Sequence, residues 1–367
     1  MGFNCGIVGL PNVGKSTLFN ALISTAVAEA ANYPFCTIEP NKGRVAVPDS
    51  RLLEISVLAN SAKVIETQLE FVDIAGLVKG ASKGEGLGNQ FLANIRETDA
   101  IIHVLRCFED DNITHVEGSV QPLRDIETIE TELLLSDLES ITRQVSNVEK
   151  KARSGDKDIK SQLEIMNKIL AVLEEGTAIR KFMNWDTQDK KLIESLNMLT
   201  SKPLVFVCNV EEESATDGNS LSKEVEAYAK KDGSECIIVS AAIEAEITQL
   251  TSQEEKNEFL TTLGLEEAGL NKLIRAGYNL LDLITFFTAG PKEARAWTLP
   301  KGSTAPQGAG RIHTDFERGF IRAETISYDD YITHGGENGA KEAGRLRIEG
   351  ADYLIKDGDV LHFRFNV

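Results

Sequence analysis

The sequence lacks any long apolar run. No stretch of its 367 residues approaches the ~18 consecutive apolar residues that a membrane-spanning helix requires. The opening residues Met-Gly-Phe-Asn-Cys place no basic leader before the first apolar segment. We therefore expect a soluble, cytoplasmic protein with no membrane partner.

Cysteines are few and scattered. The five are Cys5, Cys36, Cys107, Cys208 and Cys236, an odd number without a Cys-x-x-Cys pair. This spacing argues against a disulfide framework and against a zinc site. We expect the thiols to be small buried hydrophobic groups in a reducing compartment.

Positive charge is also scarce. The chain has 39 Lys and Arg against 57 Asp and Glu, a formal charge of -18. Such a field repels polyphosphate at long range, so a nucleic-acid partner would need a local basic patch. With 42% hydrophobic and 26% charged residues, the composition is that of a globular protein with two or three domains.

Short apolar runs alternate with helical patterns in two parts of the chain. The runs cover residues 3–8, 69–72, 100–105, 203–208 and 236–239. Buried strands that alternate with helices are typical of a parallel α/β sheet with right-handed crossovers. The sequence therefore predicts such a sheet, interrupted by a segment of another kind.

The interrupting segment has helical periodicity. Apolar residues recur in steps of three and four over 126–148 and again over 159–173, with Ser154-Gly155-Asp156 between. This pattern favours an antiparallel helical hairpin. The alternative is a pair of helices that cover the core of the main domain.

The last ninety residues have a different pattern of apolar residues and turns. We expect strands at 293–298 and 322–326 and a helix at 340–348. We also expect a final hairpin of Tyr353-Leu354-Ile355 and the alternating Leu361, Phe363 and Phe365, turning at Asp357-Gly358. These elements predict a small α+β domain.

A phosphate-binding motif follows the first strand. Gly9-Leu-Pro-Asn-Val-Gly-Lys15-Ser16 matches the P-loop pattern and precedes the helical run 17–23. In such a loop, backbone N–H groups and the helix dipole face the phosphates, Lys15 reaches the β and γ oxygens, and Ser16 ligates magnesium. The strand and helix on either side make this the most specific signal in the chain.

Two later segments extend this motif. Asp73-Ile-Ala-Gly76 ends a strand, so Asp73 would hold Mg²⁺ through water and the Gly76 N–H would sense the γ-phosphate. Thr37 lies between the two motifs and can complete the magnesium shell. The order and spacing predict a switch-type NTPase.

The glutamine that orients water in Ras-like enzymes is missing, because Leu77 follows Gly76. A leucine cannot polarise water, so another group must do so. Asn12 could supply an oxygen to a bridging K⁺ ion, or it could simply be a turn residue of the loop.

One histidine of the five is a candidate for the same task. His103 lies inside an apolar run and is expected to be a packed strand residue. His115 lies in a polar loop after that strand and could orient water at the phosphates, or could be an ordinary surface histidine.

The guanine-selecting motif Asn-Lys-x-Asp is absent. The corresponding strand is followed by Asn209-Val210-Glu211-Glu212, and the next strand by Ser240-Ala241. We expect Asn209, Val210, Glu212 and the 240–241 loop to meet the base, with Val210 under it. The altered residues predict that ATP is accepted at least as well as GTP.

Four blocks together resemble the YchF family, the Obg-like ATPases of the translation-factor class. They are GLPNVGKST (9–17), NYPFCTIEPN (32–41), the block at 71–97 and NVEE (209–212). The family's phosphate and magnesium residues carry over to matched positions: Asn12, Val13, Gly14, Lys15, Ser16, Thr17 and Thr37. The resemblance implies an ATPase with slow intrinsic turnover that binds ribosomes or their subunits.

The resemblance also implies an organisation. We expect a P-loop NTPase parallel sheet in an Obg-type G domain (1–122 and 200–276), an inserted antiparallel helical hairpin (123–199), and a C-terminal β-grasp (TGS) domain (277–367). Catalysis is assigned to Lys15, Gly76 and His115, and the metal to Ser16, Thr37 and Asp73. The expected cofactors are Mg²⁺ and, through Asn12, K⁺.

Two local basic patches could meet a ribosomal surface. Residues 143–160 and 292–322 each contain six basic against three acidic residues. Solvated faces would carry the same charges. The main hypothesis is thus an ATP-driven switch on the ribosome, and the alternatives are a ribosome-assembly GTPase or a nucleotide-gated protein-binding scaffold with negligible turnover.

Overall fold

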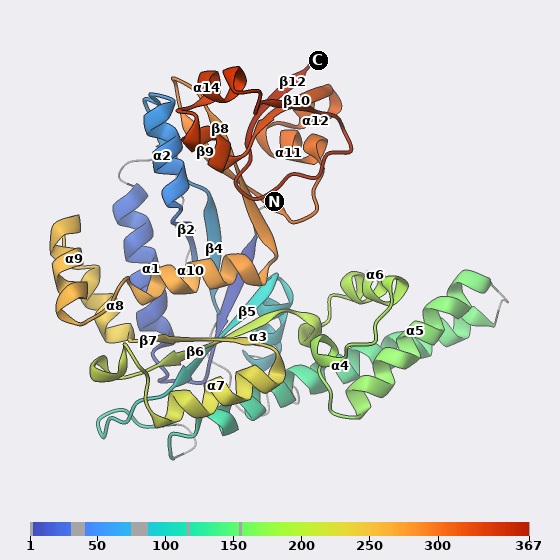
Figure 1. Cartoon of the computed structure of the whole chain (residues 1–367). Coiled ribbons are helices and arrows are strands. Elements are labelled where there is room, and N and C mark those ends of the chain that lie inside the picture. Colours follow the sequence, from blue (N-terminus) through green and yellow to red (C-terminus); the bar gives the residue numbers. More distant parts are fainter. Residues whose placement is uncertain (1–2, 31–40, 75–86, 116–117, 154–155, 367) are drawn as a thin grey trace. The chain divides into compact units, whose positions relative to one another are not determined.

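The computed structural model contains two compact units (Figure 1). It describes residues 3–30, 41–74, 87–115, 118–153 and 156–366. The first unit comprises Met1–Val45 and Glu70–Gly277, and the second Ala46–Leu69 and Tyr278–Val367. The predicted division differs, because it placed 46–69 with the nucleotide domain and set 123–199 apart.

The first unit is built on a six-stranded sheet of order β2-β4-β1-β5-β6-β7. Strands β4, β1, β5, β6 and β7 are paired in parallel. The strands are β1 (Asn4–Val8), β2 (Lys42–Ala46), β4 (Gln68–Asp73), β5 (Ala100–Arg106), β6 (Leu204–Asn209) and β7 (Glu235–Val239). The predicted parallel sheet is confirmed, and β2 was not anticipated.

The central strands are almost wholly apolar, and every residue of β5 and β6 is buried. This is what a parallel sheet with covered faces requires. Apart from the helical insertion over 122–201, this unit contains the helices α1 (Lys15–Ala30), α3 (Leu87–Arg96), α7 (Ser220–Asp232), α8 (Ala241–Ile247) and α9 (Gln253–Thr262), and a short 3₁₀ turn η3 (Glu212–Ser214). Helix α10 (Gly269–Leu280) begins in this unit and ends three residues past its boundary at Gly277.

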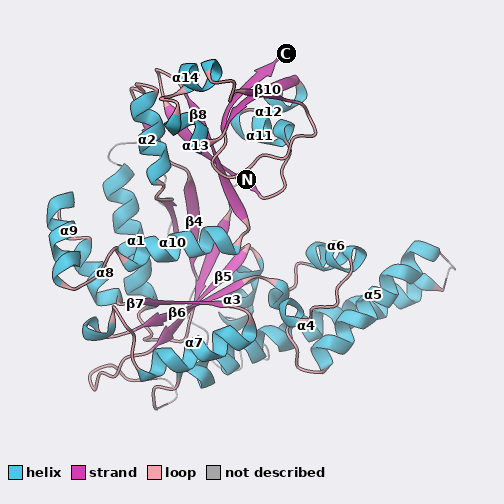
Figure 2. Cartoon of the chain, viewed as in Figure 1, coloured by secondary structure: helices cyan, strands magenta, loops and turns pink. Residues whose placement is uncertain are grey.

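The expected hairpin forms an arm of two long helices, α4 (Pro122–Ala152) and α5 (Lys157–Glu174), which run side by side (Figure 2). Their apolar stripes share a core with the segment that follows, which contains η1 (Ile179–Lys181), α6 (Thr187–Leu196) and η2 (Leu199–Ser201). The Asp156 side chain caps α5 by accepting from the Asp158 and Ile159 N–H groups. Helix α4 also contacts β5 and α7, so its base belongs to the first unit.

The second unit is a mixed six-stranded sheet of order β11-β10-β12-β8-β9-β3. Its strands are β3 (Val64–Ile65), β8 (Leu283–Ala289), β9 (Ala294–Pro300), β10 (Phe320–Ile326), β11 (Arg347–Glu349) and β12 (Val360–Phe365). Its helices are α2 (Ser50–Leu58), α11 (Ala305–Ile312), α12 (Thr314–Arg318), α13 (Tyr328–Thr333) and α14 (Glu337–Glu342). The expected strands at 293–298 and 322–326 are confirmed.

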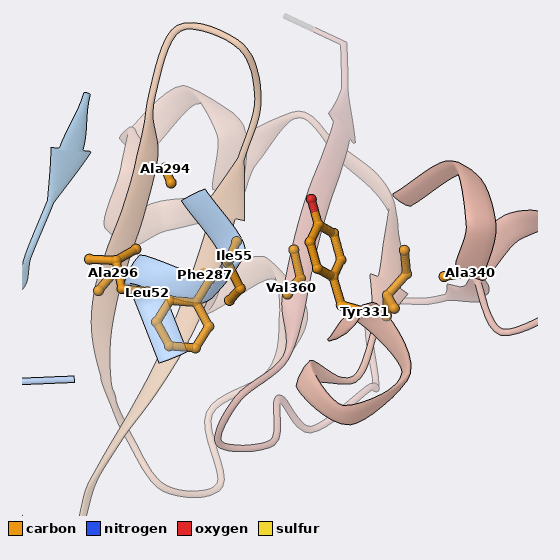
Figure 3. Close-up of a cluster of buried hydrophobic side chains, with 9 residues drawn as sticks. Leu52, Ile55, Phe287, Ala294, Ala296, Tyr331, Ala340 and Val360 are labelled. Atoms are coloured by element: carbon orange, nitrogen blue, oxygen red, sulfur yellow. The ribbon is translucent and has the colours of Figure 1, made fainter. Parts of the chain in front are cut away.

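Helix α2 reaches this unit from far away in the sequence. Figure 3 shows Leu52 and Ile55 against Phe287 and Ala296, in a core that also includes Val360. Leu52 and Ile55 are 1% and 0% exposed. Segment 46–69 is therefore held by the C-terminal core, which short-range sequence patterns could not indicate.

Two local predictions for this unit are wrong. The helix expected at 340–348 ends at Glu342, because Gly344 adopts φ +70°, and Arg347–Glu349 is instead strand β11 beside β10. The expected terminal hairpin does not form. Strand β12 pairs antiparallel with β10 and parallel with β8, while Leu354 makes an isolated bridge to Thr304.

The turn at Asp357-Gly358, on which the hairpin prediction rested, is present. Gly358 has φ +87°, but its N–H donates to the Thr285 carbonyl, and the Thr285 N–H donates to Asp357 Oδ1. These bonds tie the turn to β8 rather than to residues 353–355.

Among the described residues, no helix is both long and apolar enough to cross a membrane.

Candidate nucleotide-binding site

The P-loop connects β1 to α1, as the strand and helix expected on either side of the motif require. Asn12 has φ +64° and Gly14 has φ +90°, both in the left-handed region. A Cβ atom at Gly14 would lie 2.1 Å from Asn209 Nδ2, and one at Gly9 would lie 2.7 Å from the Val104 carbonyl oxygen. Close packing beneath the loop therefore requires a glycine at both positions, and at Gly14 the left-handed backbone requires it as well.

The charged groups of the motif converge at the ends of adjacent strands. Lys15 is the first residue of α1 and is 8% exposed, and its ammonium forms an ion pair with the Asp73 carboxylate at the end of β4. Ile7 of β1 lies in register with Asp73, so β1 and β4 deliver both groups to one edge of the sheet. The structure thus brings together Lys15, a predicted phosphate residue, and Asp73, a predicted metal residue.

This arrangement fits a nucleotide with its magnesium ion. Ser16 and Thr17 are exposed at the N-terminus of the 16-residue helix α1, where the helix dipole favours phosphate. No cluster of three or more His, Cys, Asp or Glu that could hold a metal by itself occurs in the described part of the chain. A hydroxyl and one carboxylate would suit a Mg²⁺ ion, which usually keeps several waters and binds phosphate oxygens.

Asn12 contacts a neighbouring loop. Its Nδ2 donates to the Thr114 carbonyl at 3.1 Å. This bond and the left-handed backbone support the interpretation of Asn12 as a turn residue that ties two loops together. Its role as a K⁺ ligand stays a prediction.

Asn209 joins the P-loop to the second base loop. Its Nδ2 donates to the Val13 carbonyl at 3.0 Å, and its Oδ1 accepts from the Ala241 N–H at 2.9 Å. The side chain is only 5% exposed. Asn209 therefore holds together the two segments that were expected to meet the base.

The other expected base residues differ in exposure. Val210 is 2% exposed and its N–H bonds to the Val239 carbonyl, so packing accounts for this residue and its contact with a base stays a prediction. Glu212 is exposed at the start of η3. Ser240 is 2% exposed, and its Oγ lacks a hydrogen-bond partner within the described structure. A buried hydroxyl of this kind suits a loop that completes its bonding with a ligand or a water.

The two histidines have different surroundings. His103 is fully buried, and burial lowers its pKa to about 3. This confirms that it is a packed residue of β5. His115 is also buried, which excludes the ordinary surface alternative, and its Nε2 lies 3.0 Å from Asp125 Oδ2.

Some predicted residues lie outside the described part of the chain. They are Thr37, Gly76 and Leu77, which belong to the two switch segments. Their assigned roles therefore stay predictions.

Sequence reasoning missed Arg106. This residue ends β5, is 2% exposed, and donates to the carbonyls of Phe108, Asp110 and Ile113. It thereby organises the loop that contacts Asn12. An arginine at the end of an apolar strand was the available signal.

Comparison with known families agrees with this geometry. Residues 4–136 match the MMR_HSR1 model, described as a 50S ribosome-binding GTPase. Residues 283–366 match the YchF-GTPase_C model, described as a protein of unknown function.

Full-length relatives extend these matches. The chain is 58% identical to the ribosome-binding ATPase YchF of Escherichia coli O157:H7 and 54% identical to that of Bacillus subtilis, each alignment covering 100% of both proteins. It is 37% identical to the solved YchF GTPase of Schizosaccharomyces pombe, with a TM-score of 0.90 over 99% of this chain and 98% of that one. A GTP-binding protein from Pyrococcus horikoshii, 20% identical with a TM-score of 0.62 over 99% and 100% of the two chains, shares the fold. On the strength of the full-length relatives, the chain belongs to the YchF family.

Proposed function

We propose that this protein is a cytoplasmic, Mg²⁺-dependent ATPase that acts as a nucleotide switch on the ribosome. The observation that carries the proposal is the pairing of Lys15 with Asp73 at the start of α1, beside an Asn209 that holds both base loops. A cation for phosphate, a carboxylate for magnesium and a base site thus adjoin one another. The names of the bacterial relatives, ribosome-binding ATPases, support the same activity.

Magnesium would be held by Ser16, Thr37 and Asp73. When bound, the ion neutralises charge on the transferred phosphoryl group. Lys15 binds the β and γ oxygens and the α1 dipole adds to this attraction. The protein residues therefore act mainly by positioning the phosphates, and the switch segments around Thr37 and Gly76 would respond to the γ-phosphate.

The choice between adenine and guanine is the part of the proposal for which a second candidate function exists. Glu212 is longer than the aspartate of the guanine motif, and it is exposed three residues after Asn209, the residue that bonds to the 240–241 loop. We infer that this loop accepts adenine at least as well as guanine. A GTPase acting in ribosome assembly is the second candidate, favoured by the name of the fungal relative, a YchF GTPase, and by the description of the matched family as a ribosome-binding GTPase.

Ribosome contact is proposed through the two basic patches. In the arm-tip patch, every basic side chain is exposed: Arg143, Lys150, Lys151, Arg153, Lys157 and Lys160. In the C-terminal patch, Lys292, Lys301, Arg318 and Arg322 are exposed. Exposed cations on an acidic chain are suited to phosphate backbones.

The test measures hydrolysis and ribosome binding together. ATP and GTP turnover are followed with and without ribosomes, and cosedimentation is measured in the ATP and ADP states. We expect slow ATP turnover that ribosomes accelerate, and nucleotide-dependent pelleting. Failure to pellet in every nucleotide state would contradict the switch, and turnover unchanged by ribosomes would favour a scaffold.

A further inference from the structure

The loop that carries His115 is fixed on the protein at three points. Before it, Arg106 donates to the carbonyls of Phe108, Asp110 and Ile113 at 2.8 to 3.2 Å. At Thr114, the carbonyl accepts from Asn12 of the P-loop at 3.1 Å. After it, the His115 ring meets Asp125 on the first turn of α4. The backbone next to His115 is thereby held against the phosphate-binding loop.

The His115–Asp125 pair is unusually well shielded from water. The two side chains are 3% and 1% exposed, and Nε2 and Oδ2 are 3.0 Å apart. Arg124 Nε lies 3.9 Å from the other carboxylate oxygen, and the N-terminus of α4 adds a favourable dipole. A buried polar pair of this kind is weak evidence for stability, since hydrophobic residues of similar volume often serve a core as well. The pair follows directly after the loop residue that contacts Asn12 of the P-loop, which makes it a candidate for a role in the nucleotide site.

We propose that Asp125 is a positioning residue that holds the His115 ring for nucleotide hydrolysis. This inference rests on the ATPase proposed above and on His115 as the group that orients water. A carboxylate that accepts from Nε2–H fixes the tautomer and the orientation of the ring, and stabilises the ring when it takes a proton. In this role Asp125 acts through the His115 ring and not on the nucleotide directly.

In the hydrolytic step, the oxygen of water forms a bond to the γ-phosphorus. The bond from that phosphorus to the β–γ bridging oxygen breaks, with its electron pair going to the departing diphosphate. The proton that water releases passes to the His115 ring. Asp125 keeps its charge throughout and stabilises the ring while it is positive.

The test is a double-mutant cycle with Asp125→Asn and His115→Ala. We expect D125N to lower kcat by about 10- to 100-fold while ATP affinity changes by less than about twofold. This is less than the roughly 10²- to 10⁴-fold that an acid–base group itself contributes, because Asp125 acts only through the ring. In the H115A background, D125N should lower kcat no further. Equal effects of D125N in both backgrounds, or none in either, would overturn the proposal.

Asp137→Asn is the matched control. Asp137 is a second buried aspartate of α4, and it accepts from the Leu199 and Thr200 N–H groups rather than from a histidine. D137N should lower thermal stability yet leave the kcat of the folded protein unchanged. A loss of kcat in D137N equal to that in D125N would overturn a specific role for Asp125.

A measurement without catalysis separates this inference from the proposed function. The ¹⁵N chemical shifts of the His115 ring report which nitrogen carries the proton. We expect the Nε2–H tautomer in the wild-type protein and a mixed population in D125N, whether or not the protein turns over ATP. The same tautomer in both would overturn the positioning role. If the wild-type protein shows the Nε2–H tautomer but does not hydrolyse ATP, the result would instead contradict the ATPase and leave the positioning role in place.

Discussion

Lys15 is the residue on which the proposed phosphate site depends most. It is 8% exposed and pairs with Asp73, so its charge is held in one place rather than on a mobile surface chain. A charge-assisted hydrogen bond of this kind contributes roughly 1.5 to 3 kcal/mol. A bond of the same kind from Lys15 to a phosphate oxygen would contribute a similar amount to the free energy of ATP binding.

Replacing Lys15 tests that link. We expect Lys15→Ala to weaken ATP binding by about 10- to 100-fold, because the β and γ oxygens lose their cation. Fluorescence titration with an ATP analogue measures the change. Lys157→Ala, at an exposed lysine that begins α5, is the control and should bind ATP like the wild type. Equal affinity in K15A and the wild type would remove Lys15 from the site.

His103 gives a second prediction, for stability in acid. Its pKa is lowered to about 3 by burial, so the unfolded chain binds more protons between that value and the unperturbed pKa of about 6.5. Stability is therefore lost as pH falls through this window. Between pH 7 and pH 5, the contribution of His103 falls by about 2 kcal/mol.

His103→Phe should flatten this pH dependence. The ring already packs beside Phe206 with centroids 5.7 Å apart, so phenylalanine fits the same environment. Urea unfolding at pH 7 and pH 5 measures the free energy of unfolding in each case. If the free energy of unfolding falls by the same amount between pH 7 and pH 5 in the variant and in the wild type, His103 is not the source of the acid sensitivity.

At the scale of elements, sequence patterns predicted what local periodicity controls. The parallel strands and both long arm helices were predicted because each buries one continuous apolar stripe. The placement of α2 was missed because Leu52 packs against residues more than two hundred positions away. The terminal hairpin was predicted wrongly because β12 is inserted between β8 and β10.

Helix α2 offers a paired test of the second unit. Leu52 is 1% exposed in the C-terminal core, whereas its neighbour Leu53 is 58% exposed. We expect Leu52→Ala to destabilise this unit by about 2 to 5 kcal/mol and Leu53→Ala by less than about 0.5 kcal/mol. Hydrogen exchange over 283–366 measures the effect. Equal protection in the two variants would mean that α2 does not belong to this core.

The arm tip gives a prediction for the partner. Replacing Lys150, Lys151 and Lys157 together by Ala should weaken ribosome cosedimentation and reduce its dependence on salt, because about three phosphate contacts are lost. ATP affinity should be unchanged. The control is the replacement of Lys223, Lys230 and Lys231, three exposed lysines of α7. A similar loss in both triple variants would indicate general charge rather than the arm.

At the scale of the whole molecule, the sequence predicted that Lys15 and Asp73 serve one site, and the two side chains do pair, but it did not predict the contacts that support them. The motif residues from Asn12 to Asp73 follow from spacing and strand ends. The bridge made by Asn209 and the clamp made by Arg106 depend on which strands become neighbours in the sheet. Such contacts arise only from the tertiary fold.

The central claim is that the loop from Asn209 to Glu212 has replaced guanine selection on an otherwise intact P-loop site. The most direct measurement is competition of unlabelled ATP and GTP against a fluorescent ATP analogue, with Mg²⁺, in K⁺ and then in Na⁺ buffer. We predict that ATP displaces the analogue at concentrations equal to or below those of GTP. Displacement by GTP at roughly tenfold lower concentration than ATP, a difference of about 1.4 kcal/mol, would contradict the claim and favour the GTPase.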